Sequence, residues 1–232
     1  MPKKETIIIS LGGSLIIPEE IDTNFVRRFR EMLLKQIDQG KRFLLIVGGG
    51  KTARKYQNAA QEIDEEITDE DRDWLGIHST RLNAQFLRTV FRKWAYPRIN
   101  TNPHDLEDFY QCTEPVIIAA GWRPGWSTDY DATLLAKYLD ITTIINLSNI
   151  DYVYDKDPKK HKDAQKKEKM DWKEFCTLVG DTWDPGMNAP FDPIASKQAS
   201  EEKMRVVIMN GKNIENLENY LNGKEFTGTT IE

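Results

Sequence analysis

The sequence predicts an α/β fold with a mostly parallel central sheet that is covered by helices on both faces. Two observations predict this class. Short runs rich in β-branched residues alternate with amphipathic helical patterns along the chain. The strand-like runs are almost continuously apolar, which is typical of parallel strands that are buried on both faces.

Most of the predicted strands lead directly into glycine, serine or asparagine. They comprise residues 6–11, 43–47, 115–119, 142–147 and 205–209. Between the first two, apolar residues recur at steps of three and four from Phe25 to Ile37, and Gly40 ends the pattern, so this segment is predicted to be an amphipathic helix. Further helices are predicted at residues 84–94, 132–139, 172–179 and 214–221.

Two charged tracts lie between these elements, and both are predicted to be exposed. The acidic tract at residues 62–73 is interpreted as a solvated loop or helix face, and the lysine-rich tract at 156–169 as an exposed connection. Neither resembles a tether between domains, and the alternation of strands and helices continues past both. The sequence therefore predicts a single domain that spans residues 1–232.

The composition excludes several classes of protein. A net charge of −5 with 30% charged residues argues against a general nucleic-acid binder, which needs an excess of Lys and Arg. Cys112 and Cys176 are far apart and have no metal-ligand spacing, so we interpret both as packing residues in a reducing compartment. Because no apolar run approaches ~18 residues, we expect a soluble cytoplasmic protein with no membrane partner.

Glycine-rich turns follow several predicted strands, and in such sheets ligands bind beyond the carboxyl ends of the strands. The turns lie at residues 12–14, 48–51, 120–125 and 148–151. Glycines let backbone amides approach a bulky anion, so two glycine clusters with Lys51 and Arg54 behind the second favour a phosphate site. The alternative is that each turn needs glycine only for a positive φ. The stretch IVGGGKTARK is not a P-loop, because that motif needs glycine where this chain has Leu45.

The acidic pair Asp129 and Asp131 stands at the start of a predicted helix, where Thr128 can serve as the cap. Capping alone is one explanation for the pair. The other is that Asp129 orders a lysine or a magnesium ion near a phosphoryl group in transfer. No arrangement of serine, histidine and aspartate is evident, which disfavours hydrolysis through a histidine base.

The chain resembles the amino-acid kinase family and, within it, the uridylate (UMP) kinases of the archaeal type. The resemblance covers nearly the whole chain, and its motifs occur in the family's order. They are SLGGSL (10–15), VGGGKTARKY (47–56), GIHSTRLNA (76–84), YP (96–97), RPGWSTDYDATLLA (123–136), NLSNIDYVYDKDPKK (146–160), DPIASK (192–197) and GTTIE (228–232).

The resemblance implies a three-layer α/β/α sandwich that transfers the γ-phosphoryl group of ATP to UMP with Mg²⁺, as a homohexamer. Residues up to about 140 would form the acceptor lobe, and residues from about 141 the ATP lobe. Matched family positions assign ATP to Gly12, Gly13, Ser14, Gly50, Arg54, Ser148, Tyr154 and Asp157. They assign UMP to Gly49, Asp73, Arg123, Pro124, Gly125, Trp126, Ser127, Thr128 and Asp129.

The phosphoryl transfer would rely on charge screening, with Lys51, Arg54 and Lys197 as the expected cations and no dedicated metal-ligand set in the protein. Many family members carry a catalytic lysine where this chain has Ser10, and Lys51 is hypothesised to replace it. The segment 183–191 also departs from the uridylate kinase pattern. Trp122 and Trp126 either stack on a base or close an oligomer interface.

Alternative functions within the same fold are a non-catalytic ATP-binding oligomer similar to molybdate-storage proteins, or a kinase of another small phosphorylated acceptor. An isopentenyl phosphate kinase is disfavoured, because its histidine after the triple glycine is missing here.

Overall fold

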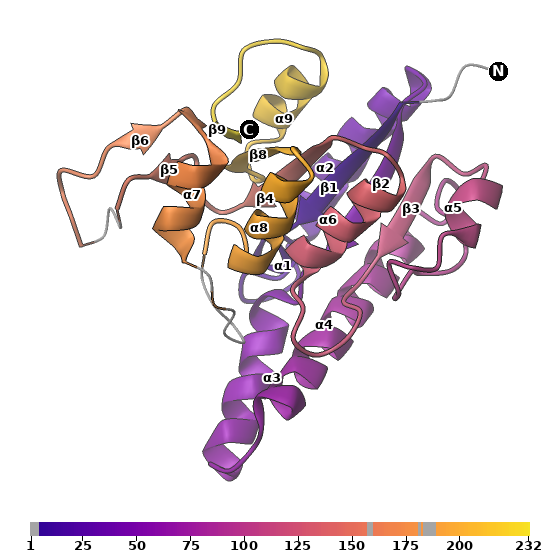
Figure 1. Cartoon of the computed structure of the whole chain (residues 1–232). Helices are drawn as coiled ribbons and strands as arrows, with labels where there is room; N and C mark the ends of the chain where they lie inside the picture. The colour runs from indigo at the N-terminus through magenta and orange to yellow at the C-terminus, as the bar shows by residue number, and fades with distance from the viewer. Residues whose placement is uncertain (1–4, 157–159, 181, 183–188) are drawn as a thin grey trace.

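The computed structural model describes residues 5–156, 160–180, 182 and 189–232. One seven-stranded sheet runs through the molecule in the order β3-β2-β1-β4-β8-β9-β7 (Figure 1). Its strands are β1 Thr6–Leu11, β2 Arg42–Val47, β3 Val116–Ala119, β4 Thr143–Ser148, β7 Lys169–Met170, β8 Arg205–Asn210 and β9 Thr229–Ile231. A separate hairpin pairs β5 Val153–Tyr154 with β6 Lys166–Lys167.

The first five strands of the sheet, from β3 to β8, pair in parallel. Only β9 and β7 run in the opposite direction, because β9 is antiparallel to β8 and parallel to β7. The chain builds β1, β2 and β3 toward one edge and then crosses to place β4 on the other side of β1. The order of the strands therefore reverses between β1 and β4, where open α/β sheets form their ligand crevice.

Helices cover both faces of this sheet, as expected from the apolar strands. They are α1 Gly13–Ile16, α2 Thr23–Asp38, α3 Gly50–Ile63, α4 Asp69–Val90, α5 Glu107–Gln111, α6 Thr128–Tyr138, α7 Trp172–Val179, α8 Pro193–Glu201 and α9 Ile214–Leu221. Buried residues of α1, α2, α4 and α9 share one hydrophobic core with alternate strand residues. Buried residues of α5, α6, α7 and α8 form the core on the opposite face. The predicted three-layer α/β/α architecture is confirmed.

The strand predictions agree with the structure to within one residue at each end, and two of the helix predictions, α7 and α9, are matched at both ends. The helix predicted at 84–94 is wrong in its bounds. It begins at Asp69, where Thr68 and Asp71 form a reciprocal capping box, and it ends at Val90. Beyond that point, turns return the chain to the sheet, where the Tyr96 amide donates to the Val116 carbonyl.

The short helices α1 and α5 were not predicted, and neither were α3 and α8, because the surfaces of α3 and α8 carry few large apolar residues. In α3 only Ala53 and Gln57 are buried, so no stripe of large side chains marks the helix. The acidic tract falls on the end of α3, the connection to α4 and the first turns of α4. The lysine-rich tract contains β6 and part of β7, so it is not only a connection. In the described part of the chain, no helix is long and apolar enough to cross a membrane.

We expect Phe29→Ala to lower the free energy of unfolding by about 3–5 kcal/mol, because the ring is fully buried between α2 and the sheet and leaves a cavity. Urea denaturation measures this loss. The matched change Arg27→Ala, on the exposed side of the same helix, should stay within about 0.5 kcal/mol of the wild type. Equal losses from the two changes would contradict the position of α2 on the sheet.

Candidate active site at the carboxyl edge of the sheet

The two glycine turns meet in direct backbone contact beyond the carboxyl ends of β1 and β2. A Cβ atom on Gly13 would lie 2.3 Å from the Gly50 nitrogen and 2.4 Å from the Gly48 carbonyl oxygen. Gly50 also has a φ of +65°, which L side chains rarely adopt. Both turns therefore require glycine for close packing, and Gly50 for its conformation as well.

Neighbouring strands hold these turns in place. The Gly12 amide donates to the Leu147 carbonyl at 2.9 Å, and the Gly48 amide donates to the Leu11 carbonyl at 2.9 Å. Helices α1 and α3 begin at these turns, at Gly13 and Gly50. The first amides of a helix have no partner inside the helix, so the arrangement presents N–H donors at one place. One of these amides, that of Lys51, donates outside α3 to the Ile17 carbonyl at 3.3 Å.

Helix α4 braces the second glycine turn through a buried asparagine. Asn83 is 1% exposed, and its Nδ2 donates to the carbonyl oxygens of Gly48 at 2.9 Å and Gly49 at 3.1 Å. These bonds keep the two carbonyls directed at α4. Asn83 lies in the motif GIHSTRLNA (76–84), but no role was predicted for it.

The same helix holds the turn after β3. The Gly121 amide donates to Thr80 Oγ1 at 2.8 Å, and the Gly125 amide donates to Asp73 Oδ2 at 2.7 Å. Burial raises the pKa of the half-buried Asp73 carboxyl. Gly125 is exposed with a φ of +84° and so makes a turn that other residues would strain. Asp73 and residues 123–125, which the resemblance places at one nucleotide, are thus brought together.

Asp129 lies at the start of α6 and joins four elements in one polar network. Its Oδ1 accepts hydrogen bonds from Ser10 Oγ at 2.7 Å and Asn146 Nδ2 at 3.2 Å, and its Oδ2 accepts from the Asp192 amide at 3.4 Å. Burial raises the pKa of Asp129 to about 7, against the lowering effect of the Ser10 bond. The pKa of Asp192 is also raised by burial. Ser10 therefore contacts Asp129 directly.

The predicted cap of α6 at Thr128 is wrong. Ser127 is the cap, and its side chain accepts a hydrogen bond from the Tyr130 amide at 3.1 Å, because the helix begins at Thr128 itself. Asp129 is consequently in the first turn, as expected, with its carboxylate directed at Ser10.

Of the expected cations, Lys51 directly follows the second glycine turn and is paired with an acid. Lys51 Nζ is 2.8 Å from Glu19 Oε1, and the Lys51 bond is the main reason that the pKa of Glu19 is lowered. Arg54 is exposed on α3, one turn beyond Lys51, and Lys197 is exposed on α8. Lys55 donates from Nζ to the Glu19 carbonyl at 3.1 Å.

The remaining predicted ATP positions are spread over α1, β4 and β5. Ser14 and Ser148 are half-buried beside the first glycine turn, since the Gly12 amide bonds to the residue that precedes Ser148. Tyr154 is half-buried in β5, outside the main sheet. Asp157 lies outside the described residues, as do residues 183–188 of the unusual segment.

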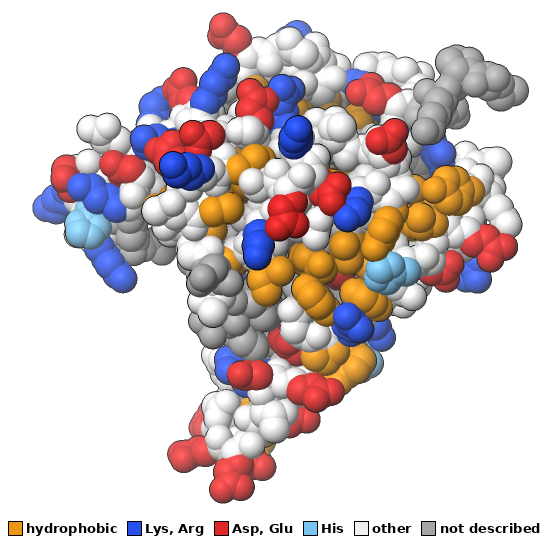
Figure 2. Space-filling model, in the orientation of Figure 1, with side chains coloured by type: hydrophobic (Ala, Val, Ile, Leu, Met, Phe, Trp, Pro, Cys, Tyr) orange, Lys and Arg blue, Asp and Glu red, His pale blue; other side chains and the backbone are white. Residues whose placement is uncertain are grey.

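Aromatic residues and one arginine form a stacked group over the turn after β3. The Arg123 guanidinium lies 4.1 Å from the centroid of the Trp122 ring and 5.6 Å from that of Trp126. The Trp126 and Tyr130 rings stack at 4.2 Å. Figure 2 shows hydrophobic side chains gathered in a band over α6 and its surroundings. The tryptophan rings are thus already stacked on protein groups.

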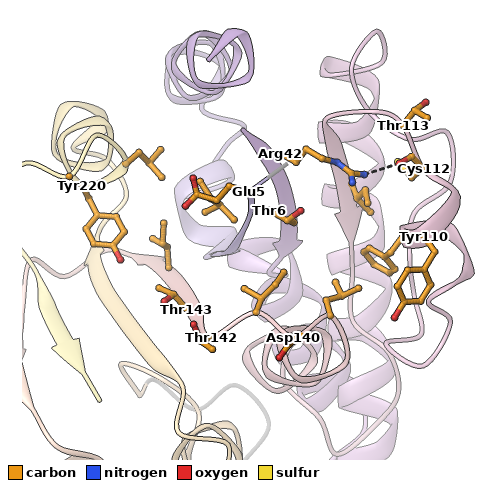
Figure 3. Close-up of a pocket in the computed structure, with 18 residues that line it drawn as sticks. Glu5, Thr6, Arg42, Tyr110, Cys112, Thr113, Asp140, Thr142, Thr143 and Tyr220 are labelled. Atoms are coloured by element: carbon orange, nitrogen blue, oxygen red, sulfur yellow. Dashed lines mark hydrogen bonds between the residues drawn. The ribbon is translucent and has the colours of Figure 1, made fainter. Parts of the chain in front are cut away.

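A cavity of about 1040 Å³ lies at the opposite edge of the sheet (Figure 3). It is lined by residues from the amino ends of β1, β2 and β4, among them Thr6, Arg42 and Thr143. The Arg42 guanidinium donates to the carbonyl oxygens of Cys112 at 3.0 Å and Glu114 at 3.3 Å. This cavity lacks the glycine turns and helix starts that suit a phosphate, so the candidate site is the carboxyl edge.

Comparison with known proteins agrees with this geometry. The model of the amino acid kinase family matches residues 5–210. The chain belongs to the amino acid kinase family. The uridylate kinase of Thermoplasma volcanium is 35% identical over 231 residues, which are 98% of this chain and 98% of that protein. The uridylate kinase of Thermococcus kodakarensis is 32% identical over 232 residues, 97% of this chain and 99% of that protein.

Among solved structures, the uridylate kinase from Archaeoglobus fulgidus superposes with a TM-score of 0.80 at 29% identity, covering 97% of this chain and 99% of that one. Family membership and fold therefore agree with the expectations from the sequence. The roles that the resemblance assigns to single residues stay predictions. In the described residues, no group of three or more His, Cys, Asp or Glu side chains is arranged to hold a metal ion.

We expect Gly13→Ala to destabilise this family member by about 1–3 kcal/mol or more, because the new Cβ would overlap backbone atoms that cannot move aside. Thermal and urea unfolding measure the change. Gly76→Ala in α4 is the matched control, since the new Cβ would meet only the end of the Gln57 side chain, at 3.1 Å. A fully stable Gly13→Ala protein would contradict the contact between the two turns.

We expect the buried Asp131 to make the free energy of unfolding depend on pH. Burial raises its pKa to about 8, so between its unfolded pKa of about 4 and about 8 the native state keeps a proton that the unfolded chain releases. Its contribution to stability is therefore present at low pH and is lost as the pH rises toward about 8. Asp131→Asn should flatten the fall in unfolding free energy between about pH 6 and about pH 8, as followed by urea titrations. Parallel curves for the two proteins would refute the assignment.

Proposed function

We propose that this protein is a nucleoside monophosphate kinase that transfers the γ-phosphoryl group of ATP to UMP and releases ADP and UDP. The observation that carries the proposal is the direct contact between the two glycine turns. Helix α4 holds both the second glycine turn and the turn after β3. The relatives named uridylate kinase extend over nearly the whole chain, which supports UMP as the acceptor.

The two nucleotides would meet with their phosphates at the glycine turns. We assign the ATP phosphates to Gly12, Gly13, Ser14 and Gly50, with Arg54 nearby, and the adenosine to the Ser148, Tyr154 and Asp157 side. The acceptor nucleotide would lie between Gly49, Asp73 and residues 123–129. Asp73 has one oxygen on the Gly125 amide, so its second oxygen is available to a ribose hydroxyl. The acceptor lobe then comprises residues up to about 140, and the ATP lobe the rest.

No general base is needed for this reaction, because a phosphate oxygen of UMP is already anionic. Catalysis of phosphoryl transfer consists mainly of positioning and charge stabilisation. Lys51, Arg54 and Lys197 are the side-chain cations that we assign to this task, together with the amides at the starts of α1 and α3. Lys51 would exchange Glu19 for phosphate, which is feasible because the ion pair is largely solvated.

Magnesium would enter with ATP. Mg²⁺ usually keeps several waters and binds through substrate phosphates and one or two carboxylates, so it does not need a preformed cage. Asp129 fits such a role, since its Oδ2 holds only a long hydrogen bond from the Asp192 amide. Bound Mg²⁺ neutralises charge on the transferring phosphate. The protein contributes the orientation of Asp129, which Ser10 and Asn146 fix.

We further propose a cytoplasmic homohexamer that acts in pyrimidine nucleotide synthesis, with small nucleotides as its partners and no nucleic acid or membrane among them. The family resemblance supports this assembly and role.

Release of ADP from ATP and Mg²⁺ in the presence of single nucleoside monophosphates tests the proposal. We expect release that depends on UMP and exceeds that with AMP or GMP. ATP binding without turnover, together with uptake of molybdate, would instead support the container of the same fold and overturn the kinase.

The role of Lys51 can be tested within the same helix. We expect Lys51→Ala to lower kcat by roughly 10²–10³-fold, equivalent to about 3–4 kcal/mol at the transition state, because a charged donor is lost. Lys55→Ala is the control, since Lys55 also contacts Glu19 but lies one turn further from the glycine turn. A loss of about threefold or less in Lys51→Ala would refute its role as the substitute for the lysine missing at Ser10.

A further inference from the structure

Asp131 is a buried acid that the proposed chemistry does not use. It lies one turn into α6 and is 1% exposed. Its Oδ2 accepts a hydrogen bond from the Trp122 amide at 3.1 Å, whereas its Oδ1 has no hydrogen-bond partner among the described residues. Burying a carboxyl group with one unsatisfied oxygen is costly. The group therefore requires an explanation other than helix capping, which Ser127 already supplies.

The peptide that Asp131 contacts is held from the opposite side by α4. Arg81 Nη2 donates to the Trp122 carbonyl at 3.0 Å, and Arg81 Nε and Nη2 both lie 3.3 Å from the Gly121 carbonyl oxygen. Together with the bond from the Gly121 amide to Thr80, these contacts engage every backbone polar group of Gly121 and Trp122. The charge of Arg81 also offsets part of the cost of burying Asp131.

We call these contacts of Asp131, Arg81 and Thr80 with the backbone of Gly121 and Trp122 the clamp. The clamp limits the directions that Arg123 can take. Residue 122 is fixed by Asp131 and Arg81, and Gly125 is fixed by Asp73, so only Arg123 and Pro124 lie between two anchored points. The Arg123 guanidinium lies 4.1 Å from the centroid of the Trp122 ring. A rotation of the Trp122 peptide would therefore move the ring and the guanidinium together.

We propose that Asp131, acting with Arg81, is a positioning residue for the acceptor nucleotide: it fixes the Trp122 peptide and so presents Arg123 to the acceptor phosphate. The proposal rests on the proposed function for its substrate. It does not give Asp131 contact with either nucleotide, and it predicts that the effect of Asp131 is confined to the acceptor.

The test compares Asp131→Leu, which removes the acceptor atom, with Asp131→Asn, which keeps an oxygen for the Trp122 amide. Steady-state ADP release gives kcat and both KM values. We expect Asp131→Leu to raise the KM for UMP about tenfold or more and to leave the KM for ATP within about twofold. Asp131→Asn should keep the KM for UMP within about threefold of the wild type, which is the rescue that a positioning role requires.

Arg81→Met removes the hydrogen bonds to the same peptide from a half-exposed position and should also raise the KM for UMP. A folding defect in Asp131→Leu therefore does not prevent the test. Asn216→Leu is the matched control, because it removes a buried side chain of α9, away from the turn, that bonds to the backbone of Thr227. It should lower stability without separating the two KM values. An unchanged KM for UMP in Asp131→Leu and Arg81→Met, or equal changes in both KM values, would overturn the proposal.

Amide hydrogen exchange separates this inference from the kinase assignment. Protection of the Trp122 and Gly125 amides should fall in Asp131→Leu and Arg81→Met and persist in Asp131→Asn, with no nucleotide present. Loss of that protection in a protein without UMP-dependent turnover would refute the kinase but keep the clamp. Unchanged protection in both variants would refute the clamp itself.

Discussion

The backbone contact between the two glycine turns is the constraint on which the rest of the site depends. It exists because β1 and β2 pair in parallel with Leu11 opposite Val47, so both strands end at the same level. The chain then turns at Gly12 and at Gly48, and the two turns meet with no room for a Cβ atom on Gly13. A shift in strand register would separate them, and the amides at the starts of α1 and α3 would no longer converge.

Helix α4 connects this local contact to the turn after β3. Asp73, Thr80, Arg81 and Asn83 extend from neighbouring turns of the helix to the second glycine turn and to the turn after β3. All four residues belong to α4, so one element sets the separation of the two turns. Its length and its capping box are therefore part of the site's geometry.

The electrostatics of the candidate site are set by buried carboxyl groups, neutral donors and one ion pair. Buried or half-buried carboxyl groups at Asp129, Asp131 and Asp192 have raised pKa values because burial disfavours their charged forms. Neutral donors, Ser10 and Asn146, bond to Asp129, and Lys51 is paired with Glu19. Positive charge placed beside Asp129 would favour the ionised form of this carboxyl group.

Much of the fold was predictable, because buried parallel strands and amphipathic helices are marked by local patterns. The strands of the sheet centre and helices α7 and α9 follow directly from such patterns. Helices α3 and α8 escaped prediction because their contacts are made by small or polar residues. The start of α4 escaped because its first turns are acidic, although Thr68 and Asp71 were a readable capping signal.

The sequence by itself determined the class of fold, the glycine turns at the strand ends and the family resemblance, since each is recorded in the order and spacing of residues. Only the tertiary structure decided which side chains brace those turns. Asn83, Arg81 and Asp131 act on carbonyl and amide groups 9 to 41 residues away, and Ser10 meets Asp129 across 119 residues. Such hydrogen bonds leave no local periodicity, because they depend on the strand order and on the placement of α4 and α6 against the sheet.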